Sequence, residues 1–289
     1  MIINENNRAN QSKRLTKTEL AISLGVSRQS LYYQPIRPAK DLLLKIQIED
    51  VMKEHKSYGH KRIATELEMN KKKIRRIMKK FGLKPHRRRV KKLIKPEDIG
   101  RLPATFKNEI KGFCPIRPNV VWVSDFTYIK FQNKFIYVAT VMDLFTREII
   151  GWSVSVRHDR YLVLEALDMA LNKTKTLPLF YHSDQGSEYD SANCITRLQE
   201  NNITVSMSEK GHPWENGFQE SFYSQFKVDL GWPDQFETLG ELIEAIHLQI
   251  DYYNKRRIHT SLKTSPVKFR ALYYSKSLIS NFPRQRQLV

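Results

Sequence analysis

The amino-acid sequence predicts an α/β protein in which small all-α modules precede a core built on a mixed five-stranded sheet. Three apolar, β-branched runs, at residues 120–131, 134–144 and 148–156, are separated by short turns, which predicts antiparallel hairpins. Helical and strand-like segments then alternate up to residue 230, which predicts parallel strands added to the same sheet. In the first hundred residues, capping residues and the helical spacing of apolar side chains predict helices.

The N-terminal helices are expected to form two units. Thr16 can cap a first helix, Gly25 provides a turn, and Ser27 can cap a second helix, which is a helix-turn-helix pattern. The second unit begins with a helix over residues 40–55 and continues as a basic helical segment over residues 61–83.

Positive charge is concentrated in this N-terminal third. The chain has 49 Lys and Arg against 30 Asp and Glu, and residues 1–100 hold 26 of the basic residues but only 10 of the acidic ones. Such a surplus suits a DNA phosphate backbone, and a recognition helix over residues 70–80 would fit a major groove. A solvated charged face is the alternative. The predicted DNA contacts in this region are Arg28, Lys61, Arg62, Lys71, Lys72, Lys73, Arg75, Arg76, Lys79, Arg87, Arg88 and Arg89.

The remaining elements follow from the same patterns. A linker rich in proline is expected over residues 84–118. After the three hairpin strands, the predicted elements are a helix at 160–173, a strand at 179–184, a helix at 191–202, a strand at 204–209 and a helix at 214–230. A long apolar helical segment then packs on the core, and the tail past Ser275 is expected to be disordered. The predicted domains are residues 1–38, 39–83, 84–118, 119–232 and 233–289.

Three acidic residues carry the functional signal. Asp125 lies within a predicted strand, Asp184 ends another strand, and Glu220 lies on a predicted helix, with 35 residues between Asp184 and Glu220. Carboxylates repel one another unless cations hold them, so the three predict a site for two Mg²⁺ ions, for which Mn²⁺ could substitute. Such a pair activates an attacking oxygen and stabilises a leaving one in phosphoryl transfer. Surface carboxylates or an inactive remnant are the alternative.

For three nearby polar residues, functions other than metal binding are predicted. Asp143 is predicted to cap a turn, His182 to be packed and hydrogen-bonded, and Glu188 to be a loop residue or a DNA contact. On the last core helix, Asn216, Glu220, Tyr223 and Lys227 share one face. Asn216 and Lys227 are therefore further candidates for contact with DNA held beside the metals.

The motifs around these residues resemble those of the DDE transposases of the IS-three insertion-sequence family. The resemblance covers roughly residues 20–270 and departs from the family pattern at Trp214, Glu215 and Gly217. It rests on W-x-x-D-x-T-Y-I (Trp122 to Ile129), V-x-D-x-x-[ST]-R-x-I-x-G-W (Val141 to Trp152), H-S-D-Q-G-S-x-Y (His182 to Tyr189), E-S-F-[FY]-x-x-x-K (Glu220 to Lys227) and Y-N-x-x-R-x-H-x-x-L-x-x-[ST]-P (Tyr253 to Pro266).

This resemblance implies a ribonuclease H-like, integrase-type catalytic core with helices on both faces of the sheet. It implies a transposase that binds the terminal inverted repeats of an insertion sequence, cleaves DNA to free 3′-hydroxyl ends and transfers them to another strand. The implied partners are double-stranded element and target DNA, further copies of the chain on that DNA, and an upstream reading-frame product or fusion.

Two other functions use the same residues. One is a DNA-binding regulator with a transposase-like body, and the other is a metal-dependent nuclease without strand transfer. The polar N-terminus is unlike a signal peptide, and no apolar run approaches the length of a membrane span, so a cytoplasmic, nucleoid-associated protein in a bacterium is expected.

Overall fold

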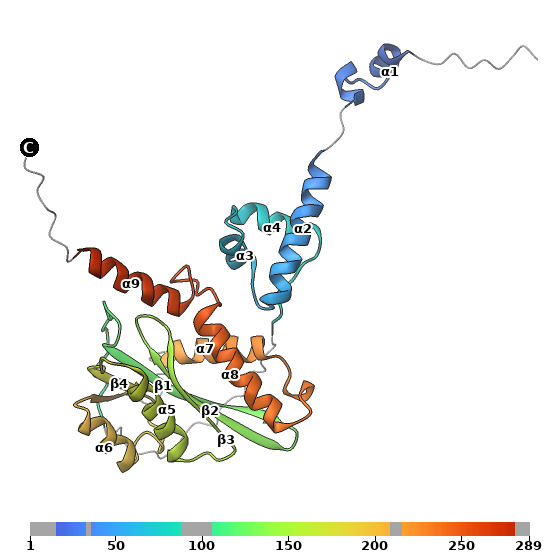
Figure 1. Ribbon diagram of the computed structural model, residues 1–289. Coiled ribbons are helices and arrows are strands. Elements are labelled where there is room, and N and C mark those ends of the chain that lie inside the picture. Colours follow the sequence, from blue (N-terminus) through green and yellow to red (C-terminus); the bar gives the residue numbers. More distant parts are fainter. Residues whose placement is uncertain (1–15, 33–35, 88–105, 209–215, 281–289) are drawn as a thin grey trace, which may run out of the picture. The chain divides into compact units, whose positions relative to one another are not determined.

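The computed structural model describes residues 16–32, 36–87, 106–208 and 216–280 of the 289-residue chain (Figure 1). The chain separates into two compact units, Met1–Ile48 and Glu49–Val289. Four residues named above lie outside the described residues. They are the predicted DNA contacts Arg88 and Arg89, and Trp214 and Glu215, where the sequence departs from the family pattern.

In the first unit, helix α1 (Lys17–Ser23) begins as predicted, because Thr16 and Glu19 form a reciprocal capping box. The following turn passes through Gly25, whose φ is +63°. The second predicted helix is instead a short 3₁₀ helix, η1 (Arg28–Tyr32). The Ser27 hydroxyl bonds the Ser30 amide and side chain, and such local bonds compete with an α-helical ladder.

Helix α2 (Ile36–Glu54) crosses the boundary into the second unit, where two short helices follow, α3 (His60–Glu66) and α4 (Lys71–Lys80). The prediction of one basic helical segment over residues 61–83 is therefore wrong in its continuity, since two helices form there. Glu68 adopts a left-handed φ of +51°, and the Asn70 side chain accepts a bond from the Lys72 amide to start a new helix. Helix α4 buries Ile74, Ile77 and Met78 and exposes its basic residues, as predicted.

The predicted mixed five-stranded sheet is confirmed. Its strands lie in the order β3-β2-β1-β4-β5, with β1, β2 and β3 antiparallel and β4 and β5 parallel to β1. The strands are β1 (Val121–Phe131), β2 (Lys134–Asp143), β3 (Ile149–Ser155), β4 (Phe180–Ser183) and β5 (Thr204–Met207). This arrangement is the one that the resemblance to a ribonuclease H-like core implies.

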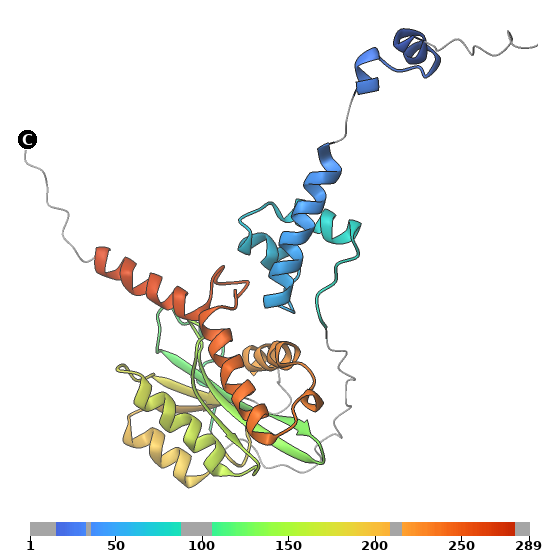
Figure 2. The ribbon, with the colours of Figure 1, turned by 45° about the vertical axis from the view of Figure 1, so that its right-hand side comes forward.

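Helices cover both faces of the sheet, as the turned view shows (Figure 2). Helices α5 (Arg160–Lys173) and α6 (Ala192–Glu200) cover one face, where Trp122 and Tyr181 are buried. Helix α5 approaches β3 so closely that a Cβ on Gly151 would lie 2.1 Å from the Ala166 carbonyl oxygen, which explains the glycine in this motif.

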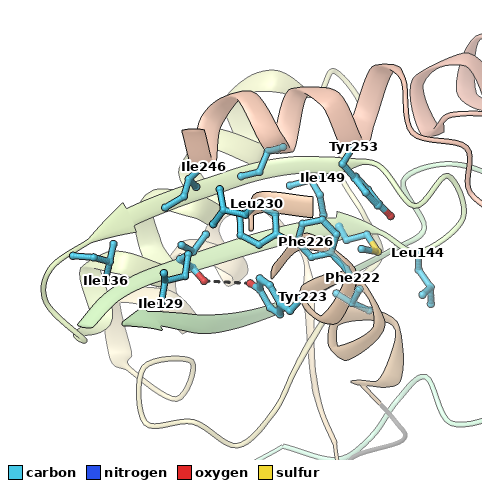
Figure 3. Close-up of a cluster of buried hydrophobic side chains, with 14 of the residues drawn as sticks. Ile129, Ile136, Leu144, Ile149, Phe222, Tyr223, Phe226, Leu230, Ile246 and Tyr253 are labelled. Atoms are coloured by element: carbon cyan, nitrogen blue, oxygen red, sulfur yellow. Dashed lines mark hydrogen bonds between the residues drawn. The ribbon is translucent and has the colours of Figure 1, made fainter. Parts of the chain in front are cut away.

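The opposite face is covered by α7 (Gly217–Leu230) and α8 (Leu239–Lys255), which are joined through the short 3₁₀ helix η3 (Pro233–Gln235). Phe222 and Phe226 of α7 pack with Ile246 and Tyr253 of α8 over the sheet (Figure 3). The predicted packing of the long apolar helix on the core is confirmed.

A ninth helix, α9 (Pro266–Ser280), follows α8 in sequence. The tail expected to be disordered past Ser275 is therefore helical as far as Ser280. The aromatic rings of Phe269 and Tyr273 on α9 pack against Phe145, a long-range contact that the sequence pattern did not reveal. Within the described residues, no helix is both long and apolar enough to cross a membrane.

Candidate active site and nucleic-acid surface

Strand pairing brings Asp125 and Asp184 to the same level of the sheet. Val123 of β1 pairs with His182 of the adjacent parallel strand β4, so each aspartate lies two residues beyond this pair. Asp125 Oδ1 accepts a bond from the Phe126 amide, and Asp184 Oδ1 accepts one from the Gly186 amide. Both side chains are half-buried. Local backbone bonds thus orient the two carboxylates, one within β1 and the other just after the end of β4.

Tyr189 lies close enough to Asp125 and Asp184 for their negative charges to affect its hydroxyl. Its ring is buried and its hydroxyl lies 3.2 Å from the Ser124 hydroxyl oxygen. Burial raises the pKa of Tyr189 well above its usual value, and the negative charges of Asp125 and Asp184 raise it further. Both carboxylates therefore act on one hydroxyl, and the region between them favours a cation.

Helix α7 is fixed against the strand that carries Asp125. The Gln219 side chain donates to the Val123 carbonyl oxygen over 2.7 Å, and the Tyr223 hydroxyl donates to the Asp125 carbonyl oxygen over 2.6 Å. Asn216 is buried and donates to the Ser124 carbonyl oxygen over 3.3 Å. These buried side chains flank Glu220, which lies in the first turn of α7 and is exposed.

The three predicted ligands are only partly assembled. Among the described residues, no group of three or more His, Cys, Asp or Glu side chains is arranged to hold a metal ion. The two aspartates supply the carboxylate oxygens that Mg²⁺ prefers, and Glu220 is not closed onto them. Glu220 is exposed, and the bonds of Gln219 and Tyr223 hold its helix against β1.

Two structural predictions for neighbouring residues are confirmed. Asp143 is buried, accepts bonds from the Asn119 and Thr146 amides, and has a pKa raised by that burial. His182 is buried with Nδ1 2.9 Å from the Ser206 hydroxyl oxygen. Glu188 lies 3.2 Å from His158 Nε2, so its carboxylate has a protein partner.

The predicted DNA contacts differ in their exposure. In the second unit, the exposed ones are Lys61, Lys71, Lys72, Lys73, Arg75, Arg76, Lys79 and Arg87, and Arg28 is exposed in the first unit. Arg62 is half-buried and Asn216 is buried, so neither lies on an open surface. The half-buried Lys227 places its ammonium 5.2 Å from the centroid of the Tyr128 ring, a cation–π contact.

Residues in the last turn of α8 and just after it join distant parts of the second unit, a function that the sequence pattern did not predict. Arg257 Nε donates to Asp229 at the end of α7 over 2.7 Å, and its Nη2 donates to Ser57 and to Gln225. Asn254 forms bonds with both the amide and the carbonyl oxygen of Ile149. The motif from Tyr253 to Pro266 was visible in sequence, but its partners Ile149 and Ser57 lie 105 and 200 residues away.

Comparisons with known proteins agree on one family. Two models, each described as an integrase core domain, match residues 115–213 and 201–266. The transposase for insertion sequence element IS904 of Lactococcus lactis is 34% identical over 255 residues, which cover 81% of this chain and 97% of that protein. The transposase InsF for insertion sequence IS3A of Escherichia coli is 33% identical over 163 residues, covering 55% of this chain and 56% of that protein.

Among solved structures, the integrase catalytic core domain of HTLV-2 in complex with magnesium aligns with a TM-score of 0.45 and 17% identity. The alignment covers 54% of this chain and 99% of that one.

Proposed function

Since the chain belongs to the DDE transposases of the IS-three insertion-sequence family and acts in DNA transposition and integration, we propose that it cleaves and joins the ends of its own element. In this proposal it binds the terminal inverted repeats, frees a 3′-hydroxyl at each end and transfers that end to another strand. The observation that supports it is the placement of Asp125 and Asp184 at one level of neighbouring strands, beside a helix that carries Glu220.

Enzymes with this core depend on divalent metal ions, and Asp125, Asp184 and Glu220 are the residues that would hold them. Two Mg²⁺ ions, or Mn²⁺ in their place, would activate the attacking oxygen and stabilise the leaving oxygen. The protein's own contribution is to hold the ligands ready. Gln219 and Tyr223 anchor the helix on β1, and Glu220, exposed in the first turn of that helix, would complete the ligand set.

Each chemical step exchanges one bond to phosphorus. In cleavage, a water oxygen bonds to the phosphorus at the element end, and the bond from phosphorus to the 3′-oxygen breaks. In joining, the freed 3′-hydroxyl oxygen bonds to a phosphorus of the second strand, and that strand's 3′-oxygen leaves. The displaced 3′-oxygen takes up a proton in both steps, so no covalent intermediate with the protein is required.

The exposed basic face of α4 would supply duplex binding. We expect several copies of the chain to act together on two element ends and the target. A fusion with the product of an upstream reading frame would extend the DNA-binding region. These three assignments concern the partners of the chain, and the chemistry at the carboxylates does not depend on them.

The test is a joining assay with the full chain, Mg²⁺ and a labelled duplex that carries the terminal repeat flanking the gene. We expect shortened strands with a new 3′ end and, with time, longer joined strands. A duplex with the same composition and a scrambled terminal repeat serves as the control. Binding with no new strands would identify a regulator, and shortened strands that are never joined would identify a nuclease, so either result would overturn strand transfer.

A further inference from the structure

A cavity with both arginine and aromatic side chains in its wall lies against a face of α7 that does not carry Glu220. It has a volume of about 380 Å³, and Gly217, Phe218 and Ser221 of α7 contribute to its wall. Glu220 precedes Ser221 by one residue, which places the two side chains about 100° apart around the helix, and Glu220 is not part of this wall. At about 30 Å³ for each water, the cavity would hold roughly a dozen water molecules, so it has room for a large polar group.

The cavity is lined by three arginines and a histidine, which come from three separate segments. Arg62 comes from α3, Arg147 from the turn between β2 and β3, and Arg257 and His259 from the segment after α8. No carboxylate lines it within the part of the chain that the structure describes. Arg257 is held by Asp229 outside the wall, whereas no described carboxylate forms an ion pair with Arg62 or Arg147.

The electrostatic effect of this cluster is visible at His259. Burial lowers the pKa of His259 to about 4, and the positive charges of Arg147, Arg257 and Arg62 contribute to the shift. Burial likewise lowers the pKa of Arg62 and of Arg147. Asp229 and Asp143 offset part of this effect at Arg62 and Arg147, but neither forms an ion pair with these two arginines among the described residues. An anion in the cavity would therefore relieve a cost of burying cations that the folded protein otherwise carries.

Hydrogen-bond donors in the wall also lack acceptors. Arg62 Nε and Arg147 Nη1 are buried atoms for which no described residue accepts a bond. The Arg147 guanidinium is held in place by the Phe218 ring, whose centroid lies 3.8 Å away. The first amides of α7 begin at Gly217 in the same wall, and the Asn216 side chain does not cap them.

We propose that this cavity binds a phosphate group of the DNA, beside a face of α7 that does not carry Glu220. This proposal rests on the proposed function, since it assigns a part of the same substrate. A DNA strand is favoured over a small phosphate compound because the positive surface continues beyond the cavity. Arg62 also lines a neighbouring pocket with Lys61, Lys71 and Lys72, at the start of the predicted recognition helix.

The consequence is a positioning function for Arg147 and Arg62. Glu220 lies in the first turn of α7, and the cavity touches that same turn on a different face. A phosphate held there fixes the DNA relative to the helix that carries the third metal ligand. Loss of this contact should therefore reduce joining more than it reduces overall DNA affinity, because the basic helices still hold the duplex.

The experiment uses the full chain, inorganic phosphate as the probe, and the variants Arg147→Gln and Arg197→Gln. The second variant is the matched control, because Arg197 lies on α6, pairs with Asp168 and is partly exposed. Phosphate binding is followed at pH 7 and low salt by the ring NMR signals of His259, which are assigned with His259→Gln. We expect the signals to shift in the wild type and in Arg197→Gln, and the affinity to fall at least tenfold in Arg147→Gln.

Element-end binding over a range of salt then connects the cavity with DNA. The slope of log affinity against log salt should decrease by about 0.9 in Arg147→Gln, as expected for one lost phosphate contact, and should stay constant in the control. If Arg147→Gln does not fold, as judged by thermal unfolding, Arg62→Gln takes its place.

Two outcomes would overturn the proposal. His259 signals that do not respond to phosphate would mean that the cavity holds only water, and equal affinity or salt slope in Arg147→Gln and the control would mean that the site is not at Arg147. Neither readout requires catalysis. A wild-type chain that binds phosphate here but never joins DNA would therefore contradict the proposed function and leave the cavity assignment intact.

Discussion

Asp125→Asn, Asp184→Asn and Glu220→Gln should each lower end cleavage and joining by orders of magnitude in Mg²⁺. Each change keeps the size of the side chain and removes a negative charge that the metal ions require. DNA affinity should survive, because the exposed basic residues of α4 are distant in sequence and unchanged. The measurement is the joining assay with labelled element ends, together with binding of the same duplex.

Glu188→Gln is the matched control for these variants. Its carboxylate lies near Asp184, since a Cβ on Gly186 would be 3.0 Å from an oxygen of each, but it is paired with His158. We expect this variant to keep most of its joining activity. Substantial joining by the Asp125, Asp184 or Glu220 variant would remove that residue from the metal site.

Arg257→Ala should lower the free energy of unfolding of the second unit by about 3–5 kcal/mol. The side chains of Arg257 and Asp229 are only 3% and 5% exposed, so the change leaves a buried carboxylate without its cation. It also removes the bonds from Arg257 to Ser57 and Gln225, which join the segment before α3 to α7. Denaturant unfolding of the full chain, followed by the tryptophan signal, measures the loss.

An exposed ion pair provides the comparison. Arg197 and Asp168 have side chains that are 44% and 35% exposed, so Arg197→Ala should cost no more than about 1 kcal/mol. The double change Arg257→Leu with Asp229→Leu should recover part of the stability lost in Arg257→Ala, because no unpaired charge remains buried. Equal stability of Arg257→Ala and Arg197→Ala would show that the Asp229 pair does not hold these elements together.

The catalytic core could be predicted from sequence because its elements have strong local signals. Helix α5 was predicted with the observed bounds, since apolar spacing defines its buried face and Asp159 caps it. The strands alternate clearly or are continuously apolar, and short turns fix their antiparallel pairing. The placement of Asp125 and Asp184 at the same height in the sheet then follows from the parallel pairing of β1 with β4.

Features that depend on contacts between distant residues could not be predicted in the same way. The break between α3 and α4 depends on one left-handed residue, Glu68, within a sequence of good helix formers. The cluster of Arg62, Arg147 and His259 combines three segments that have no common sequence pattern. These residues meet because α7 and α8 pack on the sheet and because Ser57 and Tyr58, just before α3, bond with Arg257 and Ile258.

Asp125, Asp184 and Glu220 should hold the same metal ions, although Glu220 is exposed and no three candidate ligands are grouped among the described residues. Iron-directed cleavage tests this most directly, because Fe²⁺ in a Mg²⁺ site generates hydroxyl radicals that cut the nearby backbone in the presence of ascorbate and peroxide. With the full chain and an element-end duplex, we predict cuts close to residues 125, 184 and 220, all suppressed by excess Mg²⁺. Cuts near 125 and 184 without any near 220, or cuts that Mg²⁺ does not suppress, would contradict the three-carboxylate site.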